Sequence, residues 1–359
     1  MERQPPAGTE QRHALFGDLT PQSVHCATLT ELDAPHRLLA ACYAFSYETA
    51  PDSRIVASTW DGERWSASRT IVDLPGIAAG NPVLFTGRDG TVHLFFALLY
   101  GQEWTDARVT HMSSTDGGAT WGPMTTLHPM KGLMTKTRPL QLADRLLLPV
   151  YDESTWCAHV LVGPVLVGPV PVGPVPVGPV VVSEGALTGG APTPGAPTDG
   201  APTDWQLYGD TTARRKTIQP AIVELADGTL LMYARSVKDR IFVARSFNGG
   251  YTWTASQPTP LPNPNSGIDL IGLRSGRLLL VYNPTNVGRE QLALAVSEDE
   301  GVSWSAPILL EDGVGEFSYP YVIQVSDGRI HLLYTAQRVA ITHLVLDEAW
   351  LLERVRVRV

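Results

Sequence analysis

Charged and polar side chains recur at the two ends of short apolar runs along this sequence. Three arginines of this kind, Arg138, Arg235 and Arg338, are candidates for holding a carboxylate or sulfate, because a planar guanidinium offers two parallel hydrogen bonds. The candidate acids and bases are carboxylates in similar positions, namely Glu48, Asp152, Asp269 and Glu316. Two such groups facing one site could do general acid–base work if burial or a neighbouring charge raised one pKa.

The uncharged candidates are one tyrosine and four residues expected to bind substrate: Tyr319, His25, Asn81, Gln219 and Asn265. Tyr319 could instead pack its ring where a strand begins. Structural roles are also open to the carboxylates, since a loop glutamate can be merely solvated and an aspartate in a Pro/Asn/Gly-rich turn can cap that turn. In "YDE" (151–153), successive strand residues face opposite ways, so only one of the two carboxylates can face a site.

Composition narrows the class of protein. The chain has 43% apolar and 18% charged residues and a net charge of −9, with no basic block typical of nucleic-acid binding. Its three scattered cysteines predict neither a disulfide framework nor a metal site, and no cofactor motif is present. The N-terminus lacks a signal-peptide core, and no apolar run approaches the ~18 residues of a membrane helix. We therefore expect a cytoplasmic protein with a small-molecule or glycan ligand, its oligomeric state left open.

A repeated motif indicates the elements that position these residues. "STDGGATW" (114–121), "SFNGGYTW" (246–253) and "SEDEGVSW" (297–304) share the pattern Ser-x-Asp/Asn-x-Gly-x-x-Trp. A fourth copy, "STWDGERW" (58–65), has tryptophan where the acid is expected. The pattern is typical of a tight hairpin, in which the acid accepts backbone N–H bonds, glycine supplies a positive φ and tryptophan packs beneath.

Six pairs of short strands accompany these hairpins. The first strands begin at "HCATLTEL", "NPVLF", "RPLQL", "QPAIVEL", "GIDLIGL" and "YPYVIQV", and each is followed by a turn and an apolar second strand. Units spaced at about 50 residues predict an all-β fold, a six-bladed β-propeller of four-stranded antiparallel blades. The last blade lacks a hairpin motif, and we expect "RHALFGDL" near the N-terminus to complete it in preference to "ERVRVRV" at the C-terminus. In such a ring, the starts of the first strands and the ends of the second strands converge on one axial funnel.

Blade three holds a low-complexity insertion over residues 160–210. It consists of Val-Gly-Pro repeats (160–182) and Gly-Ala-Pro-Thr repeats (190–204), placed where the outer hairpin is expected. We interpret it as a tandem expansion of that hairpin. A polyproline-type ligand for a partner and an inter-domain hinge are the alternatives. Because strands on both sides belong to one repeat series, residues 1–359 are predicted to form a single domain.

Six blades with hairpins of this form, called Asp boxes, resemble the sialidase superfamily, in particular its BNR-repeat branch. The resemblance rests on "GNPVLF", "QPAIVELADGTLLMYARS", "LPNPNSGIDLIGLRSGRLLLVYN" and "GEFSYPYVIQVSDGRIHLLYT", and it covers residues 20–347 apart from the insertion. Sialidases resembling this fold use a tyrosine nucleophile assisted by a glutamate, an aspartate acid/base and three arginines that grip the substrate carboxylate. The Arg-Ile-Pro motif of their first blade is absent here, where the strand reads "VHCATL".

The resemblance implies an exo-glycosidase that acts on an acidic or oxygen-rich small substrate in the funnel. Tyr319 would be the nucleophile and Glu316 its partner, Glu48 or Asp152 would handle the proton, and the arginines would orient the acid group. A lyase or cyclase that uses the same funnel for acid–base chemistry is one alternative. A non-catalytic carbohydrate-binding propeller is another, because fold alone does not fix function.

Overall fold

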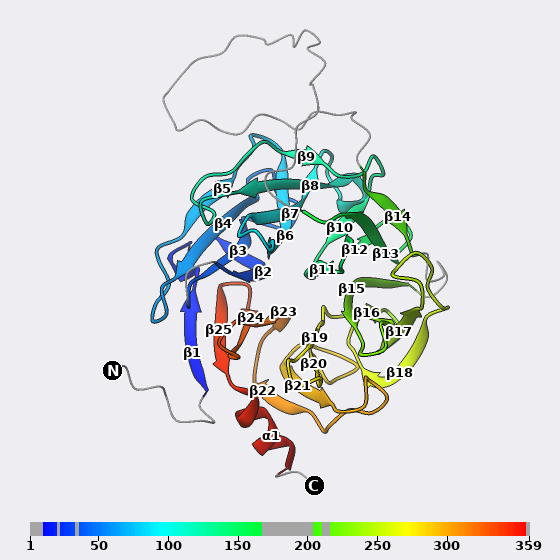
Figure 1. Cartoon of the computed structure of the whole chain (residues 1–359). Helices are drawn as coiled ribbons and strands as arrows, with labels where there is room; N and C mark the ends of the chain where they lie inside the picture. The colour runs from blue at the N-terminus through cyan, green and yellow to red at the C-terminus, as the bar shows by residue number, and fades with distance from the viewer. Residues whose placement is uncertain (1–9, 20–21, 33–35, 167–203, 210–215, 357–359) are drawn as a thin grey trace, which may run out of the picture.

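The described strands form six antiparallel sheets arranged in a ring (Figure 1), and this architecture confirms the predicted six-bladed β-propeller. The structure is a computed structural model that describes residues 10–19, 22–32, 36–166, 204–209 and 216–356. Five sheets have four strands, whereas the innermost strand of blade three is broken into two pieces that both pair with the next strand.

The strands follow the chain blade by blade. Blade one contains β2 (Ser23–Glu31), β3 (Leu38–Phe45), β4 (Arg54–Trp60) and β5 (Arg69–Val72). Blade two contains β6 (Ala78–Thr86), β7 (Val92–Leu99), β8 (Ala107–Ser114) and β9 (Thr125–Thr126). Blade three contains β10 (Leu133–Thr135), β11 (Leu140–Gln141), β12 (Arg145–Asp152), β13 (Cys157–Pro164) and β14 (Gln206–Tyr208).

The other three blades repeat the pattern. Blade four contains β15 (Thr217–Glu224), β16 (Leu230–Ser236), β17 (Arg240–Ser246) and β18 (Gln257–Pro262). Blade five contains β19 (Asp269–Gly272), β20 (Leu278–Tyr282), β21 (Gln291–Ser297) and β22 (Ile308–Asp312). Blade six contains β23 (Phe317–Gln324), β24 (Ile330–Ala336), β25 (Ala340–Leu346) and, as its outer strand, β1 (Gln11–Leu15).

The N-terminal strand closes the ring, as the sequence predicts. β1 pairs antiparallel with β25 from Gln11↔Val345 to Leu15↔Ile341. The C-terminal alternative is excluded because residues Glu348–Arg356 form a helix, α1. Short 3₁₀ helices η1 (Gly17–Leu19) and η2 (Trp104–Asp106) complete the described elements. Within the described residues, no helix has the length and apolar character needed to cross a membrane.

The low-complexity insertion falls between the third and fourth strands of blade three. β13 takes in the first residues of the Val-Gly-Pro repeat, and β14 pairs with it after the Gly-Ala-Pro-Thr repeat. Residues 167–203 lie outside the described part of the chain. The single-domain assignment over residues 1–359 therefore stays a prediction.

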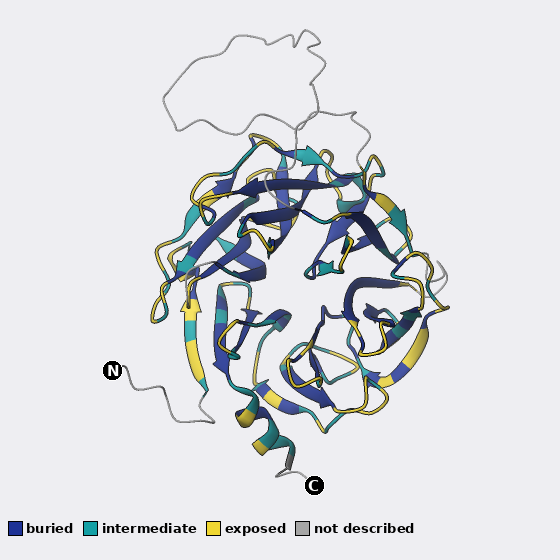
Figure 2. Ribbon diagram, viewed as in Figure 1, coloured by how far each residue is buried: buried dark blue, intermediate teal, exposed yellow. Residues whose placement is uncertain are grey.

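Burial explains why the second strands are continuous apolar runs. Every residue of β3 and β7 is buried, because neighbouring blades pack on both faces of these strands (Figure 2). The outer strands β1 and β18 alternate toward solvent instead. The apolar core is thus divided among the interfaces between blades, and it leaves the ends of the strands free for polar groups.

The Ser-x-Asp-x-Gly-x-x-Trp segments form tight hairpins. In the last copy, Asp299 accepts hydrogen bonds from the backbone N–H of Ser303 at 2.8 Å and from the Ser297 hydroxyl at 2.8 Å. The degenerate copy in blade one (58–65) has tryptophan at the position of the acid and uses the next residue, Asp61. Its carboxylate accepts hydrogen bonds from the backbone N–H groups of Glu63 and Arg64 at 3.0 and 2.9 Å. The acid is therefore displaced by one position in that blade.

Candidate functional site

Antiparallel pairing brings two sets of residues to the same end of the ring. The start of each innermost strand pairs with the end of the second strand, as Phe317↔Ala336 illustrates in blade six. The loops between second and third strands therefore project beside the starts of the innermost strands. We name the group found there the Tyr319 cluster, which comprises His25, Tyr151, Glu153, Gln219, Arg235, Arg289, Glu316, Tyr319 and Arg338.

Bulges at the strand starts aim side chains into this cluster. Asn81, Gln219 and Tyr319 have φ of 49°, 54° and 53°, and each precedes a proline at a register shift of its sheet. A bulge turns one side chain away from the regular alternation, and a positive φ is costly for a residue other than glycine. The same bulge occurs at Cys26 in blade one, with φ of 51°, so it is a recurring feature of the innermost strands that redirects one side chain in each of these blades.

The Tyr319 hydroxyl is held by an amide and a guanidinium. Gln219 Nε2 donates to it at 3.1 Å and Arg235 Nη1 at 3.0 Å, while the same Arg235 nitrogen donates to Gln219 Oε1 at 3.0 Å. Gln219 and Arg235 are both buried. In the described part of the chain, no carboxylate lies within hydrogen-bond distance of this hydroxyl. Both lone pairs of its oxygen are thus engaged by donors.

Cations and an imidazole also surround the Tyr319 ring. The guanidinium carbons of Arg235 and Arg289 each lie 5.9 Å from the ring centroid, within cation–π range. The buried His25 ring lies 4.1 Å from it, centroid to centroid, and His25 Nδ1 is 3.0 Å from Thr335 Oγ1. Burial, and next the positive charge of Arg338, lower the pKa of His25 well below its usual value. This imidazole is therefore neutral at pH 7.

Glu316 contacts the arginines and makes no hydrogen bond to the tyrosine hydroxyl. It accepts hydrogen bonds from Arg289 at 2.8 Å, Arg338 at 3.0 Å and Ser318 at 2.6 Å. Burial opposes its ionisation, but the hydrogen bonds from Ser318 and Arg338 outweigh burial and lower the Glu316 pKa to about 2. Arg338 also pairs with Glu48 at 2.5 Å. The predicted partner of Tyr319 is therefore a fixed anion that positions two arginines.

Blade three contributes Glu153 in place of Asp152. Asp152 is buried and accepts the Ser154 N–H at 2.9 Å and the Thr155 hydroxyl at 2.5 Å, so it caps its own turn. Glu153 interacts with Arg235 and with the Tyr151 hydroxyl, and burial raises its pKa against the effect of Arg235. We correct the assignment accordingly, because the two neighbours face opposite ways and Asp152 is the one that points away.

Arg138 and Asp269 do not join the cluster. They pair with each other at 2.9 Å, and Asp269 also accepts the Val322 N–H at 2.7 Å, farther along the innermost strands. The third arginine is Arg289, which the sequence analysis missed. It lies in the loop after the second strand of its blade, as Arg338 does, whereas Arg235 is at the end of the second strand itself; this shared end of the blade is the signal that could have identified it.

The other candidates surround the cluster. Asn81 donates to the Tyr151 hydroxyl at 3.1 Å and to the Thr135 carbonyl at 3.0 Å. Asn265 offers its backbone carbonyl to Arg289 at 3.1 Å. Lys136, which the sequence places with Arg138 at the start of the innermost strand of blade three, is fully buried and donates to the Ile268 and Pro320 carbonyls at 2.6 Å each. This lysine ties blades three, five and six together beside Tyr319.

The cluster can receive a ligand anion. The side chains of Arg289 and Arg338 are 24% and 31% exposed, so both reach solvent. Within the described residues, Arg235 and Arg338 each keep an Nη2 without a hydrogen bond and Arg289 keeps its Nε. The three arginines balance Glu48, Glu153 and Glu316 in formal charge, and the free donor nitrogens are the groups that a bound carboxylate would contact. In the described part of the chain, no group of three His, Cys, Asp or Glu side chains could hold a metal ion.

The model of the BNR repeat-like domain matches residues 36–166 and 175–332. The chain belongs to this family. The match confirms the resemblance to sialidase-like BNR propellers that the repeats indicate. No curated protein sequence matches the chain.

Solved structures share this propeller fold at low sequence identity. A Hadza microbial sialidase is 18% identical with a TM-score of 0.70, and the alignment covers 91% of this chain and 66% of that one. The intramolecular trans-sialidase of Ruminococcus gnavus, in complex with oseltamivir carboxylate, is 13% identical with a TM-score of 0.69, covering 91% and 95%. A Dyadobacter fermentans protein of unknown function is 15% identical with a TM-score of 0.65, also covering 91% and 95%. The aligned region of this BNR repeat-like chain thus spans 66% of the Hadza sialidase, just under two thirds, and 95% of each of the other two proteins.

Proposed function

We propose that this BNR repeat-like protein binds a small sugar acid at the Tyr319 cluster and cleaves its glycosidic bond. The observation that carries the proposal is the arrangement of Arg235, Arg289 and Arg338, from three blades, around one tyrosine and its partners. Guanidinium groups bind carboxylates through paired, charge-assisted hydrogen bonds. Similarity to a sialidase and a trans-sialidase supports the same substrate class.

In this proposal, Tyr319 attacks the anomeric carbon. Arg235 and Gln219 donate to its oxygen, and these two donors would stabilise negative charge there as the phenol loses its proton. Glu153 is the candidate acid for the leaving oxygen, because burial raises its pKa and keeps more of it protonated. Glu48, paired with Arg338, is the second candidate. The phenolic proton would pass to solvent water. The Glu153 carboxylate would then take a proton from a second water molecule, whose oxygen attacks the anomeric carbon and releases the sugar acid, and Tyr319 would regain a proton from solvent.

A second candidate function is elimination or ring closure on the same substrate. It is favoured by the contacts of the Tyr319 hydroxyl, which meets a guanidinium and an amide but no described carboxylate that could serve as its base. A tyrosine beside an arginine could exchange a proton with the substrate without forming a covalent intermediate. In both candidate reactions the substrate is a sugar acid, and the three arginines bind its carboxylate.

The test is a turnover assay on the full chain with 4-methylumbelliferyl glycosides of acidic and neutral sugars. We expect turnover of an acidic glycoside only, and a loss of at least about a hundredfold in kcat/KM for Tyr319→Phe. Tyr251→Phe, a change at an exposed hairpin tyrosine, is the matched control and should leave turnover unchanged. Turnover in Tyr319→Phe equal to that of the unchanged protein would remove Tyr319 from the mechanism.

Mass spectrometry of the product separates the candidate reactions. A product with the mass of the free sugar acid indicates hydrolysis, whereas one lighter by a water molecule indicates elimination or ring closure. Saturable binding of the acidic sugar with no product under any condition would indicate a carbohydrate-binding propeller and would overturn both enzymatic candidates.

A further inference from the structure

A cavity lies at the opposite end of the innermost strands from the Tyr319 cluster. Its volume is about 560 Å³, and its walls are the later residues of β2, β6, β19 and β23, with Arg138 from blade three. Because these are the innermost strands of different blades, the cavity lies on the axis of the ring. Small-molecule sites typically measure roughly 300–1,000 Å³, so this one is large enough for a compact ligand.

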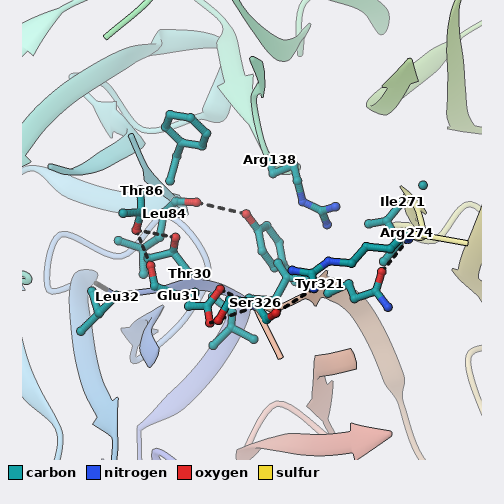
Figure 3. Close-up of a pocket in the computed structure, with 15 residues that line it drawn as sticks. Thr30, Glu31, Leu32, Leu84, Thr86, Arg138, Ile271, Arg274, Tyr321 and Ser326 are labelled. Atoms are coloured by element: carbon teal, nitrogen blue, oxygen red, sulfur yellow. Dashed lines mark hydrogen bonds between the residues drawn. The ribbon is translucent and has the colours of Figure 1, made fainter. Parts of the chain in front are cut away.

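Two arginines from different blades face this cavity. Figure 3 shows Arg138 and Arg274 extending toward Tyr321, with Arg138 from blade three and Arg274 from the turn after β19. The Arg138 guanidinium carbon lies 5.4 Å from the Tyr321 ring centroid, and Asp269 balances its charge. Arg274 donates from Nη1 to the Ser326 carbonyl at 2.7 Å. Within the described residues, Arg274 has no carboxylate partner.

The cavity's one lining carboxylate is already bound to backbone and hydroxyl groups. Glu31 accepts the Ser326 N–H at 2.8 Å, and the Ser326 hydroxyl also donates to it. It makes no ion pair with an arginine of the cavity in the described part of the chain. Asp269 and Glu31 thus offset the formal charges of the two arginines, but Arg274, which is exposed and has no carboxylate partner among the described residues, keeps donor nitrogens free for a ligand.

The walls combine apolar and polar side chains in similar measure. Leucine and isoleucine side chains, Phe85 and the Tyr321 ring form the apolar part, and on the polar part Thr30 and Thr86 bond to each other at 2.8 Å. A ligand that fits these walls has an anionic head for Arg274 and a flat apolar body. We propose that this cavity is a second binding site, separate from the Tyr319 cluster, for a small amphipathic anion.

Calorimetric titration of the full chain with three naphthalene probes tests the proposal. 1-Naphthyl phosphate and 1-naphthoate carry the anionic heads that could occupy the site, and 1-naphthol has none. We expect one anion to bind per chain and 1-naphthol to bind at least tenfold more weakly. The anion that binds with the higher affinity identifies the preferred head group, phosphate or carboxylate. Equal binding of all three probes, or no binding, would overturn the proposal.

Four variants locate the binding site. Arg274→Gln should weaken anion binding about tenfold. Gly272→Trp should abolish it, because Gly272 lines the cavity with open space beside its Cβ position and an ordinary φ. Arg277→Gln, three residues from Arg274 but paired with Glu298 and Glu348 outside the cavity, should bind as the unchanged protein does. If Arg289→Gln abolishes binding and Arg274→Gln and Gly272→Trp do not, the anion binds at the Tyr319 cluster and the second site is refuted.

Discussion

The residue that most limits the chemistry of this protein is Gln219. It occupies a bulge at the start of β15, and its amide contacts both the Tyr319 hydroxyl and Arg235. The sialidases that this family resembles place a glutamate beside their tyrosine, and a carboxylate can accept the phenolic proton. An amide cannot do so at neutral pH. Gln219 therefore leaves Tyr319 without a base among the described residues.

We predict that Gln219→Glu increases turnover of the acidic glycoside. The new carboxylate would lie about where the amide nitrogen now donates to Tyr319 at 3.1 Å, and Arg235 would hold it ionised. A correctly placed general base contributes roughly 10²–10⁴-fold, so an increase in kcat of at least about tenfold is expected. Steady-state kinetics at pH 7 measure it.

The control for this change is Gln257→Glu, which adds the same charge at an exposed position on β18. It should leave kcat unchanged. A Gln219→Glu protein that is folded and no faster than the unchanged protein would show that proton removal from Tyr319 does not limit the reaction. That result would favour a role for Tyr319 as a hydrogen-bond donor.

Sequence reasoning found several of these residues and misplaced others, for reasons of local geometry. Tyr319, Gln219, His25 and Arg235 could be predicted because each lies at the end of an apolar strand. Which of two neighbours faces the site depends on strand register, and a single bulge reverses it. Asp152 was therefore chosen where Glu153 faces the cluster, and Arg289 was missed because its loop carries no apolar pattern.

Among the elements, the repeats predict the six blades, whereas the register of the closing strand β1 follows only from its pairing with β25. We call this junction of β1 and β25, with the side chains packed on it, the seam. Hairpin motifs and turn spacing fixed the order of strands, whereas closure by β1 involves a partner more than 300 residues away in sequence. The seam contains a hydrogen-bonded chain in which Trp65 Nε1 donates to His343 Nδ1 at 3.2 Å. His343 Nε2 lies 2.9 Å from His331 Nδ1.

This seam should make the fold sensitive to acid. Protonation of His343 would place a hydrogen on Nδ1, which already receives the Trp65 N–H. Burial lowers the pKa of His331 to about 3 and that of His343 well below its usual value. Because the unfolded histidines bind protons near pH 6.5, the stabilising effect of the neutral pair is complete above that pH. It is lost as the pH falls toward 3, by up to about 1.4 kcal/mol per pH unit for each histidine.

Urea unfolding at several pH values between 7 and 4 measures this effect. We expect the free energy of unfolding to fall with pH less steeply in His331→Gln than in the unchanged protein. Other buried histidines, such as His93 and His111, are present in both proteins, so their contribution cancels in the comparison. Identical slopes would contradict a titrating seam.

At the scale of the whole molecule, the ring presents different chemistry at the two ends of its axis. One end holds the Tyr319 cluster, with Glu48 paired to its Arg338, and the other holds the cavity of Arg138 and Arg274. Both arise from the same strands, because an antiparallel blade brings loops of different kinds to its two ends. In the chain, the low-complexity insertion falls between β13 and β14 of blade three, and its residues 167–203 lie outside the described part.

In the proposed function, Arg235, Arg289 and Arg338 together hold a substrate carboxylate beside Tyr319. The most direct test is calorimetric binding of the tightest-binding sugar acid from the substrate screen, compared with its methyl ester. We predict that the ester binds at least tenfold more weakly, about 1.4 kcal/mol, and that Arg289→Gln removes most of this difference while Arg277→Gln preserves it. Equal affinity for the acid and the ester in the unchanged protein would contradict the claim.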